Sequence, residues 1–234
     1  YGAEGLETPA FDRIAERGVL FTQAFAAVPS CTPSRSAILT GQEMWRLEEG
    51  GLLFGTLPAR FDVFPRMLEE AGYAIGSTGK TWSPGDLEAG GRTRAPTGPS
   101  YTDHALDSSR TGMSNLDYAA NFEAFLEDRE GERPLFFWYG ASEPHRSYND
   151  GQGLAAGKEL ADARLPRSLP DTPLVRSDVL DYYVEIEHFD RHLGRMLREL
   201  RRQGELENTL VVVTSDHSMP FPRAKANGLY DASS

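Results

Sequence analysis

The strongest chemical signal in the sequence is a lone cysteine close to a proline and an arginine. In the segment Cys31-Thr32-Pro33-Ser34-Arg35, the proline predicts a helix that starts directly after the cysteine. The group at position 31 would then face unpaired backbone N–H groups and the positive end of the helix dipole, which suits a thiolate or another anion. Arg35, one turn later, can reach back to the same group. The segment therefore predicts an activated group at position 31, with a buried, inert cysteine as the alternative.

Further polar groups stand directly after segments that are typical of buried strands. They are Lys80, His145 and the pair Asp216-His217, after the segments 73–76, 134–139 and 209–214. The carboxyl ends of parallel strands meet at one edge of a sheet, where ligands bind. A carboxylate can bind a metal there, and a histidine can transfer protons near neutral pH. An exposed lysine and histidines in surface loops are the alternatives for each position taken alone.

Helix and strand signals alternate along the chain. Helices are expected over 9–17, 33–39, 65–70, 116–126 and 177–201, and strands over 19–25, 73–76, 134–139 and 209–214. The clearest helix is the last, because its apolar residues recur at steps of three and four. At the first helix, Thr8 is the expected N-cap and Pro9 the first helical residue. This alternation predicts an α/β fold with a mostly parallel sheet.

The composition limits the kinds of partner. The 234 residues carry a net charge of −11, which argues against nonspecific binding of nucleic acid. Cys31 is the only cysteine, so the chain cannot form an internal disulfide. No apolar run is long enough to span a bilayer.

The segment 31–35, followed by a short helix and Thr40-Gly41, resembles the signature of type I sulfatases. The preceding segment 8–21 is also similar to that family. The resemblance implies an alkaline-phosphatase-like three-layer sandwich with a mostly parallel central sheet. It further implies that a sulfatase-maturing enzyme oxidises Cys31 to formylglycine, whose hydrate attacks sulfur.

The resemblance also implies roles for individual residues. The catalytic residues would be Cys31, Arg35, Lys80, His145 and Lys225. One divalent cation, Ca²⁺ in most of the family, would be held by Cys31, Asp216 and His217. The two lysines would bind sulfate, while His145 would contact sulfate or protonate the leaving group.

The sequence departs from the family pattern after Lys80. Many members carry a histidine two or three residues later, whereas this chain has Thr81-Trp82-Ser83 there. His104 is a possible substitute. Residues 1–234 are expected to be a partial sulfatase catalytic domain, because the first strand with its aspartate pair and the C-terminal subdomain are not in this sequence.

Two segments, 143–146 and 219–222, are similar to bacterial relatives of the heparan N-sulfatases (N-sulfoglucosamine sulfohydrolases). The leading hypothesis is therefore hydrolysis of a sulfate ester or N-sulfate (sulfamate) of a sulfated saccharide, in a periplasmic or extracellular enzyme. A phosphatase or phosphonate hydrolase of the same superfamily is one alternative. A pseudo-sulfatase that binds sulfated glycans without cleaving them is another.

Overall fold

The computed structural model describes residues 3–107 and 112–225. Those within Tyr1–Thr22, Ala105–Ala119 and Ala141–Val213 form one compact unit, called unit 1. Those within Gln23–His104, Ala120–Gly140 and Thr214–Ser234 form the other, called unit 2. None of the helices in the described ranges is both long and apolar enough to cross a membrane.

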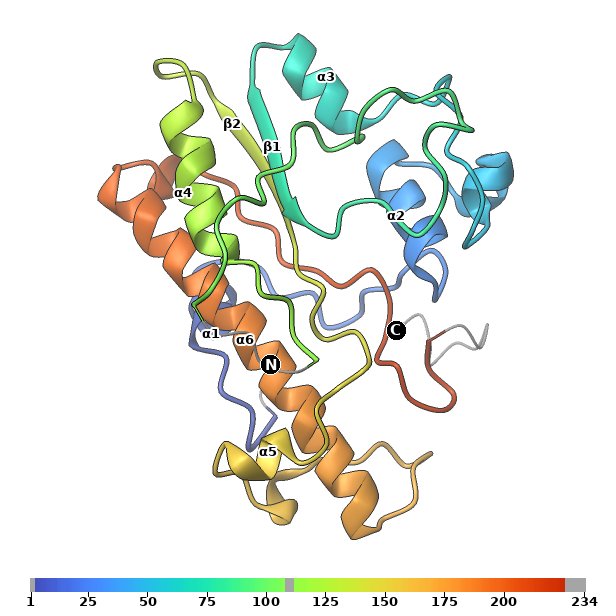
Figure 1. Ribbon diagram of the computed structural model, residues 1–234, viewed down its shortest axis with the longest axis vertical. Helices are drawn as coiled ribbons and strands as arrows, with labels where there is room; N and C mark the ends of the chain where they lie inside the picture. The colour runs from blue at the N-terminus through green and yellow to red at the C-terminus, as the bar shows by residue number, and fades with distance from the viewer. Residues whose placement is uncertain (1–2, 108–111, 226–234) are drawn as a thin grey trace. The chain divides into compact units, whose positions relative to one another are not determined.

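Along the described chain, three α-helices precede the first strand, one lies between the two strands, and two follow the second (Figure 1). The α-helices are α1 (Pro9–Arg17), α2 (Cys31–Thr40), α3 (Phe64–Glu70), α4 (Tyr118–Asp128), α5 (Gln152–Ala155) and α6 (Pro173–Arg202). The strands are β1 (Ala74–Gly79) and β2 (Leu135–Gly140). Short 3₁₀ helices are η1 (Met44–Arg46), η2 (Glu48–Gly51), η3 (Leu160–Asp162) and η4 (Leu206–Asn208). The five predicted helices and the strands expected over 73–76 and 134–139 are confirmed, with shifts of a few residues at their ends.

The sheet of unit 2 is parallel. Strands β1 and β2 pair in register from Ala74 opposite Leu135 to Gly79 opposite Gly140. The segment around Pro99 continues the sheet beside β1, where the Ser77 N–H donates to the Pro99 carbonyl at 2.9 Å. A parallel sheet needs crossover connections, and this one confirms the predicted α/β class.

Helices cover both faces of this sheet. Successive residues of a strand point to opposite faces, and β2 presents two phenylalanines in succession. Phe136 meets Phe64 of α3 with ring centroids 5.2 Å apart, whereas Phe137 meets Phe122 and Phe125 of α4 at 4.9 Å each. Unit 2 is therefore built as three layers, helix, sheet and helix (Figure 1).

A buried apolar cluster supports helix α2. It comprises Leu39, Leu57, Val63 and Trp82, and Trp138 of β2 packs against it. Helix α2 places Leu39 in this cluster and ends at Gly41, whose φ of +65° favours glycine. Because the cluster fixes the orientation of α2, it also fixes where the residues of the first turn of that helix lie.

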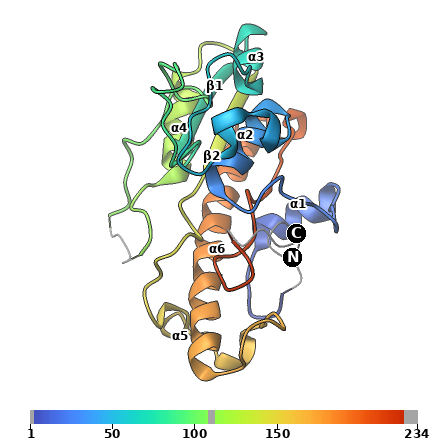
Figure 2. The ribbon, with the colours of Figure 1, turned by 90° about the vertical axis from the view of Figure 1, so that its right-hand side faces the viewer.

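In unit 1, the long helix α6 organises the packing. Figures 1 and 2 both show α5 beside the first half of α6. Helix α1 packs on α6 through Phe11 and Phe189, whose rings lie 5.6 Å apart. The Asp190 carboxylate accepts hydrogen bonds from the backbone N–H groups of Ala10 (3.0 Å) and Phe11 (2.8 Å). Thr8 is the N-cap residue and Pro9 the first helical residue, as predicted, but the Thr8 side chain makes no cap hydrogen bond, and Asp190 supplies the acceptors instead.

The strands predicted over 19–25 and 209–214 are wrong. Neither segment joins the sheet formed by the described residues. Phe21 is 76% exposed and Leu210 is 89% exposed. Apolar, β-branched runs form strands only where a neighbouring strand supplies ladder hydrogen bonds and a face to pack against. The structure gives these two segments neither.

Acidic side chains are buried along α6. Glu185 is fully buried, and its Oε1 accepts a hydrogen bond from the Gln152 amide at 2.9 Å, while its Oε2 has no partner among the described residues. Burial, reinforced by the nearby charges of Glu143 and Asp181, raises the pKa of Glu185 to about 7. The carboxyl group therefore binds a proton more tightly in the folded than in the unfolded chain.

This burial predicts a pH dependence of stability. Because the pKa of Glu185 rises from 4.5 to about 7 on folding, the contribution of this group to the free energy of unfolding is largest below pH 4.5 and is lost as the pH rises from there through about 7. Glu185→Gln should remove on the order of 2 kcal/mol of this decrease between pH 5 and pH 8. The measurement is urea unfolding across that range. Glu207→Gln, which changes an exposed carboxylate of the same unit, is the control. Equal slopes for wild type and Glu185→Gln would contradict the assignment.

Candidate active site

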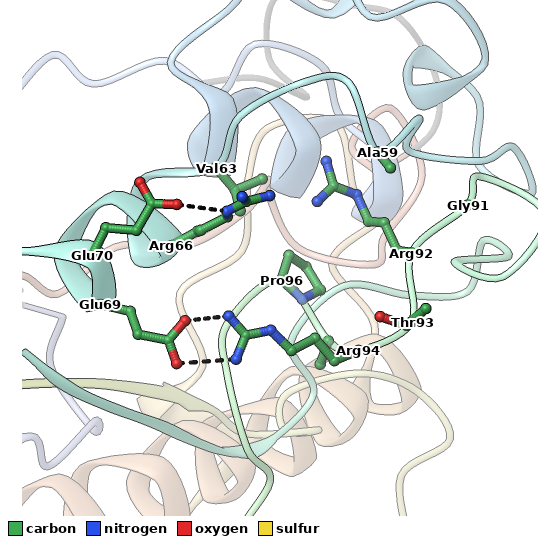
Figure 3. A pocket seen from close by; sticks show the side chains of 11 residues that line it. Ala59, Val63, Arg66, Glu69, Glu70, Gly91, Arg92, Thr93, Arg94 and Pro96 are labelled. Carbon is green, nitrogen blue, oxygen red and sulfur yellow. Dashed lines mark hydrogen bonds and ion pairs between the residues drawn. The ribbon is translucent and has the colours of Figure 1, made fainter.

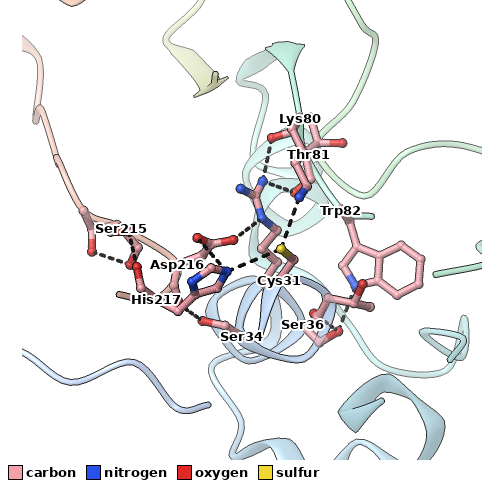
Figure 4. A network of polar contacts seen from close by, with 12 residues as sticks. Cys31, Ser34, Ser36, Lys80, Thr81, Trp82, Ser215, Asp216 and His217 are labelled. Carbon is pink, nitrogen blue, oxygen red and sulfur yellow. Dashed lines mark hydrogen bonds and ion pairs between the residues drawn. The ribbon is translucent and has the colours of Figure 1, made fainter. Parts of the chain in front are cut away.

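Cys31 is the first residue of helix α2 and is buried. The helix begins two residues before the predicted start, since the Ser34 N–H already donates to the Ser30 carbonyl at 3.1 Å. Pro33 lies in the first turn, where its missing N–H costs no helical hydrogen bond. Figure 4 shows the cysteine at this end of the helix, facing side chains from two other segments.

Two basic side chains contact the cysteine sulfur. The Lys80 ammonium donates to Cys31 Sγ at 3.2 Å, and Nε2 of His217 lies 3.4 Å from the same atom (Figure 4). Positive charge at this distance favours a thiolate, or another anion, over a neutral group. Activation of the group at position 31 stays a prediction, which these two contacts favour.

Lys80 is positioned by the end of the sheet. It follows β1 directly, and its backbone N–H donates to the carbonyl of Gly140 at the end of β2. A Cβ atom at Gly140 would lie 1.8 Å from the Lys80 carbonyl oxygen, so only glycine permits this approach. The close approach of the two strand ends thus fixes the backbone from which the ammonium reaches Cys31.

Arg35 connects three parts of the site. Its Nε donates to the Asp216 carboxylate at 2.8 Å, and its Nη1 donates to the carbonyls of Lys80 (2.6 Å) and Thr81 (2.7 Å). The guanidinium is buried, so these acceptors replace the water it has lost. Arg35 therefore joins α2, the segment after β1 and the Asp216-His217 loop.

The charges around Asp216 keep it ionised. Burial alone would raise the pKa of Asp216, but the positive charges of Arg35, His217 and Lys80, together with the Arg35 hydrogen bond, outweigh burial and hold the pKa below its usual value. Burial also opposes the charged form of His217, yet its contact with Cys31 and the charge of Asp216 raise the pKa of His217 overall. Opposite charges thus alternate through the cluster.

The contact of Nδ1 determines the tautomer of His217. Nδ1 lies 2.9 Å from the Ser218 carbonyl oxygen, which can only accept, so Nδ1 carries a proton. In the neutral imidazole, Nε2 then presents its lone pair toward Cys31. That lone pair could accept the thiol proton or bind a metal.

Three of these groups could hold a metal ion. Ligand atoms of Cys31, Asp216 and His217 all lie within 4.8 Å of one another. A thiol sulfur, a carboxylate oxygen and an imidazole nitrogen suit a divalent metal, and this combination is one that zinc accepts. Calcium takes six to eight oxygen ligands, so these three residues alone would not complete a calcium site. Oxidation of Cys31 to an aldehyde hydrate would replace the sulfur with oxygen and bring the donors closer to what calcium prefers.

His145 lies in unit 1, and the structure shows how its loop is held there. Glu143 accepts hydrogen bonds from the Tyr118 hydroxyl at 2.9 Å and from the Ser114 N–H at 2.6 Å. The His145 N–H donates to the Ser142 carbonyl at 3.0 Å. The catalytic role of His145 stays a prediction.

Lys225 and His104 also stay predictions. Lys225 lies in the loop after His217, where its backbone N–H donates to the Met219 carbonyl at 3.2 Å. His104 is exposed, and its backbone exchanges two hydrogen bonds with the amide side chain of Asn121.

Two supporting groups were not predicted from the sequence. The Ser34 hydroxyl donates to the Asp216 backbone carbonyl. The Trp82 indole donates to the Ser36 hydroxyl at 2.8 Å and ties α2 to the segment after Lys80. A tryptophan within a segment rich in glycine, serine and proline was the available signal, because such a residue usually has a packing partner.

The model of the family described as Sulfatase matches residues 1–231. The chain therefore belongs to the sulfatase family, as the segment 31–35 predicted.

Individual relatives agree with this assignment. The chain is similar to N-sulphoglucosamine sulphohydrolase of Homo sapiens, with 28% identity over 97% of this chain and 49% of the relative. It is 35% identical to N-acetylgalactosamine-6-sulfatase of Canis lupus familiaris, over 97% of this chain and 48% of that one. The chain thus spans about half the length of these curated relatives.

Solved structures agree on the fold. A candidate sulfatase from Bacteroides fragilis matches with a TM-score of 0.70 and 19% identity, over 93% of this chain and 58% of that one. The fold is therefore alkaline-phosphatase-like, as the resemblance implied.

The contacts of Arg35 predict that lysine cannot replace it. Arg35→Lys keeps the charge but loses the planar fork that serves Asp216 and two carbonyls at once. The free energy of unfolding should fall by about 2 kcal/mol or more, measured by urea denaturation. Arg60→Lys, at an exposed pair with Glu48, is the control and should change stability by less than about 0.5 kcal/mol. Equal effects of the two substitutions would contradict the connecting role of Arg35.

Proposed function

We propose that this chain is the core of an enzyme that hydrolyses a sulfate ester or sulfamate of a sulfated saccharide, with the oxidised side chain of Cys31 as nucleophile. The observation that carries the proposal is the convergence of Lys80 and His217 on Cys31 at the first turn of α2. The names of the human and canine relatives, which refer to sulfated amino sugars, support this class of substrate.

The proposed chemistry depends on oxidation of Cys31 by a sulfatase-maturing enzyme. A hydrated aldehyde would supply two hydroxyl groups on one carbon, one to attack sulfur and one whose deprotonation later expels sulfate and restores the aldehyde. In the first step the attacking hydroxyl would lose its proton to solvent, a new S–O bond would form at position 31, and the bond from sulfur to the sugar oxygen or nitrogen would break. We propose that His145 gives the proton that the departing sugar needs.

The residues of unit 2 have distinct roles in this proposal. The Lys80 ammonium, 3.2 Å from Sγ, would pair with the negative charge of the nucleophile and of the bound sulfate. Lys225 would add a second positive charge toward the sulfate. The guanidinium of Arg35 is occupied by Asp216 and two carbonyls, so Arg35 acts as a positioning residue that orients the carboxylate and the backbone of Lys80.

We further propose Ca²⁺ as the divalent metal, held by Asp216, His217 and the oxidised residue 31. Bound there, the cation would stabilise negative charge on the nucleophile and on the sulfate oxygens. Because these residues supply too few oxygen ligands by themselves, the calcium site needs additional donors in the whole protein. We also propose a periplasmic or extracellular location, in keeping with the usual export of such enzymes.

The proposed nucleophile predicts that Cys31→Ala abolishes sulfate release. The measurement uses the whole protein, produced together with a maturing enzyme, and follows hydrolysis of an aryl sulfate and of a sulfated amino sugar. The substitution should lower kcat by at least about 1,000-fold, because no hydroxyl would remain at the attacking position. An aryl phosphate tested in parallel should be a much poorer substrate. Retained activity in Cys31→Ala would contradict the mechanism, and faster phosphate release would favour a phosphatase.

The proposed metal site predicts that Asp216→Asn weakens calcium binding. Removing the charge of a ligand should lower the affinity at least about tenfold. The measurement is the rise of the thermal midpoint with added Ca²⁺ in the matured whole protein. Asp86→Asn, which changes an exposed aspartate of the same unit, is the control. A midpoint that rises equally in both variants would contradict the assignment of Asp216.

A further inference from the structure

Unit 2 has a second group of charged side chains, lining a pocket of about 360 Å³ (Figure 3). The charged lining residues are Arg66, Glu69, Glu70, Arg92 and Arg94. None of them belongs to the Cys31 cluster. The pocket therefore brings three positive and two negative charges together outside the candidate active site.

The carboxylates neutralise only part of this positive charge. Glu69 pairs with Arg94 through both of its oxygens. Glu70 accepts from Nε of Arg66 at 2.9 Å. Arg92 forms no ion pair with any described carboxylate. One positive charge thus remains after each acid has been assigned to its partner.

Arg92 is held by neutral groups. Its Nε donates to the Leu57 carbonyl at 2.8 Å, and its Nη2 donates to the carbonyls of Pro58 (3.1 Å) and Phe61 (2.5 Å). These carbonyls satisfy donors without cancelling the charge. Burial and the nearby charge of Arg66 lower the pKa of Arg92, and the negative charge of Asp62 opposes them only in part. The position of this guanidinium is therefore fixed while its charge is poorly compensated.

Donors remain available in the pocket. Among the described residues, no acceptor bonds Nη1 of Arg92 or either Nη of Arg66. Figure 3 shows the two guanidinium groups pointing toward one another across the pocket. Two facing guanidinium groups repel each other, and an oxoanion between them would turn this repulsion into charge-assisted hydrogen bonds.

We propose that this pocket binds a sulfate or carboxylate group of an acidic saccharide chain, through Arg66 and Arg92. The choice of a saccharide rests on the proposed function, because a chain with repeated acidic groups would contact the protein beyond the group being hydrolysed. The overall charge of −11 would repel such a chain elsewhere. The pocket would therefore favour longer, multiply sulfated substrates over single sugars.

The test is calorimetric titration of the chain, with Cys31 unconverted, by a heparin-derived tetrasaccharide and separately by inorganic sulfate, at low salt. Arg66→Gln removes a charge from an exposed side chain and should weaken tetrasaccharide binding about three- to tenfold. Thr93→Asp places a carboxylate in the pocket lining and should weaken it further. Arg17→Gln, at an exposed ion pair on α1, removes the same charge elsewhere and should leave affinity unchanged.

Unchanged tetrasaccharide affinity in both pocket variants would overturn the proposal. An effect on inorganic sulfate alone would also overturn it, because the pocket would then hold a free ion rather than a saccharide group. An equal loss of tetrasaccharide affinity in the Arg17→Gln control would show that overall charge causes the effect, and it would contradict binding in this pocket. These titrations need no catalysis, so they distinguish failure of the pocket from failure of the proposed sulfatase chemistry.

Discussion

The guanidinium of Arg35 is the constraint on which the candidate active site depends. It lies one turn along α2 from Cys31 and is bonded to the Asp216 carboxylate and to the carbonyls that follow β1. Separate segments, distant in sequence, thus share one buried cation. Without it, a half-buried carboxylate and two carbonyls would lose their donor, and the loops that carry Lys80 and His217 would no longer be held together.

The electrostatics of the site follow from this arrangement. Arg35 holds Asp216 ionised, Asp216 favours the charged form of His217, and His217 and Lys80 together favour negative charge at position 31. Each charge is stabilised by a neighbour of opposite sign in a partly dry environment, where such interactions are stronger than in water. An acidic protein can in this way maintain a local site for an anionic nucleophile and an anionic substrate.

The sequence predicted the fold class and which residues lie together at this site, but not every strand. The spacing from Cys31 to Arg35 and the family resemblance identified the cysteine and four residues that lie together with it, because this motif is local and specific. These four are Arg35, Lys80, Asp216 and His217. The strands expected over 19–25 and 209–214 failed for a different reason. Their composition favours strands, but pairing depends on neighbours that a local pattern cannot reveal.

A helix cap supplied by a distant residue could not be predicted from the sequence either. Asp190, 180 residues from Ala10, caps helix α1, and nothing in the segment around Thr8 indicates that its own side chain would not do so. The pocket around Arg66 and Arg92 is a similar case, since its members are unremarkable exposed or half-buried arginines until the fold brings them together. Local patterns were therefore enough to predict most helices and the cysteine motif, whereas contacts between distant segments became known only from the structure.

The mass of the tryptic peptide Gly18–Arg35 would show whether Cys31 is the precursor of the nucleophile. The peptide would come from the protein produced together with a sulfatase-maturing enzyme, with a known sulfatase as a control for conversion. We expect the thiol to be replaced by an aldehyde or its hydrate. An intact cysteine, in cells where the control sulfatase is converted, would contradict it.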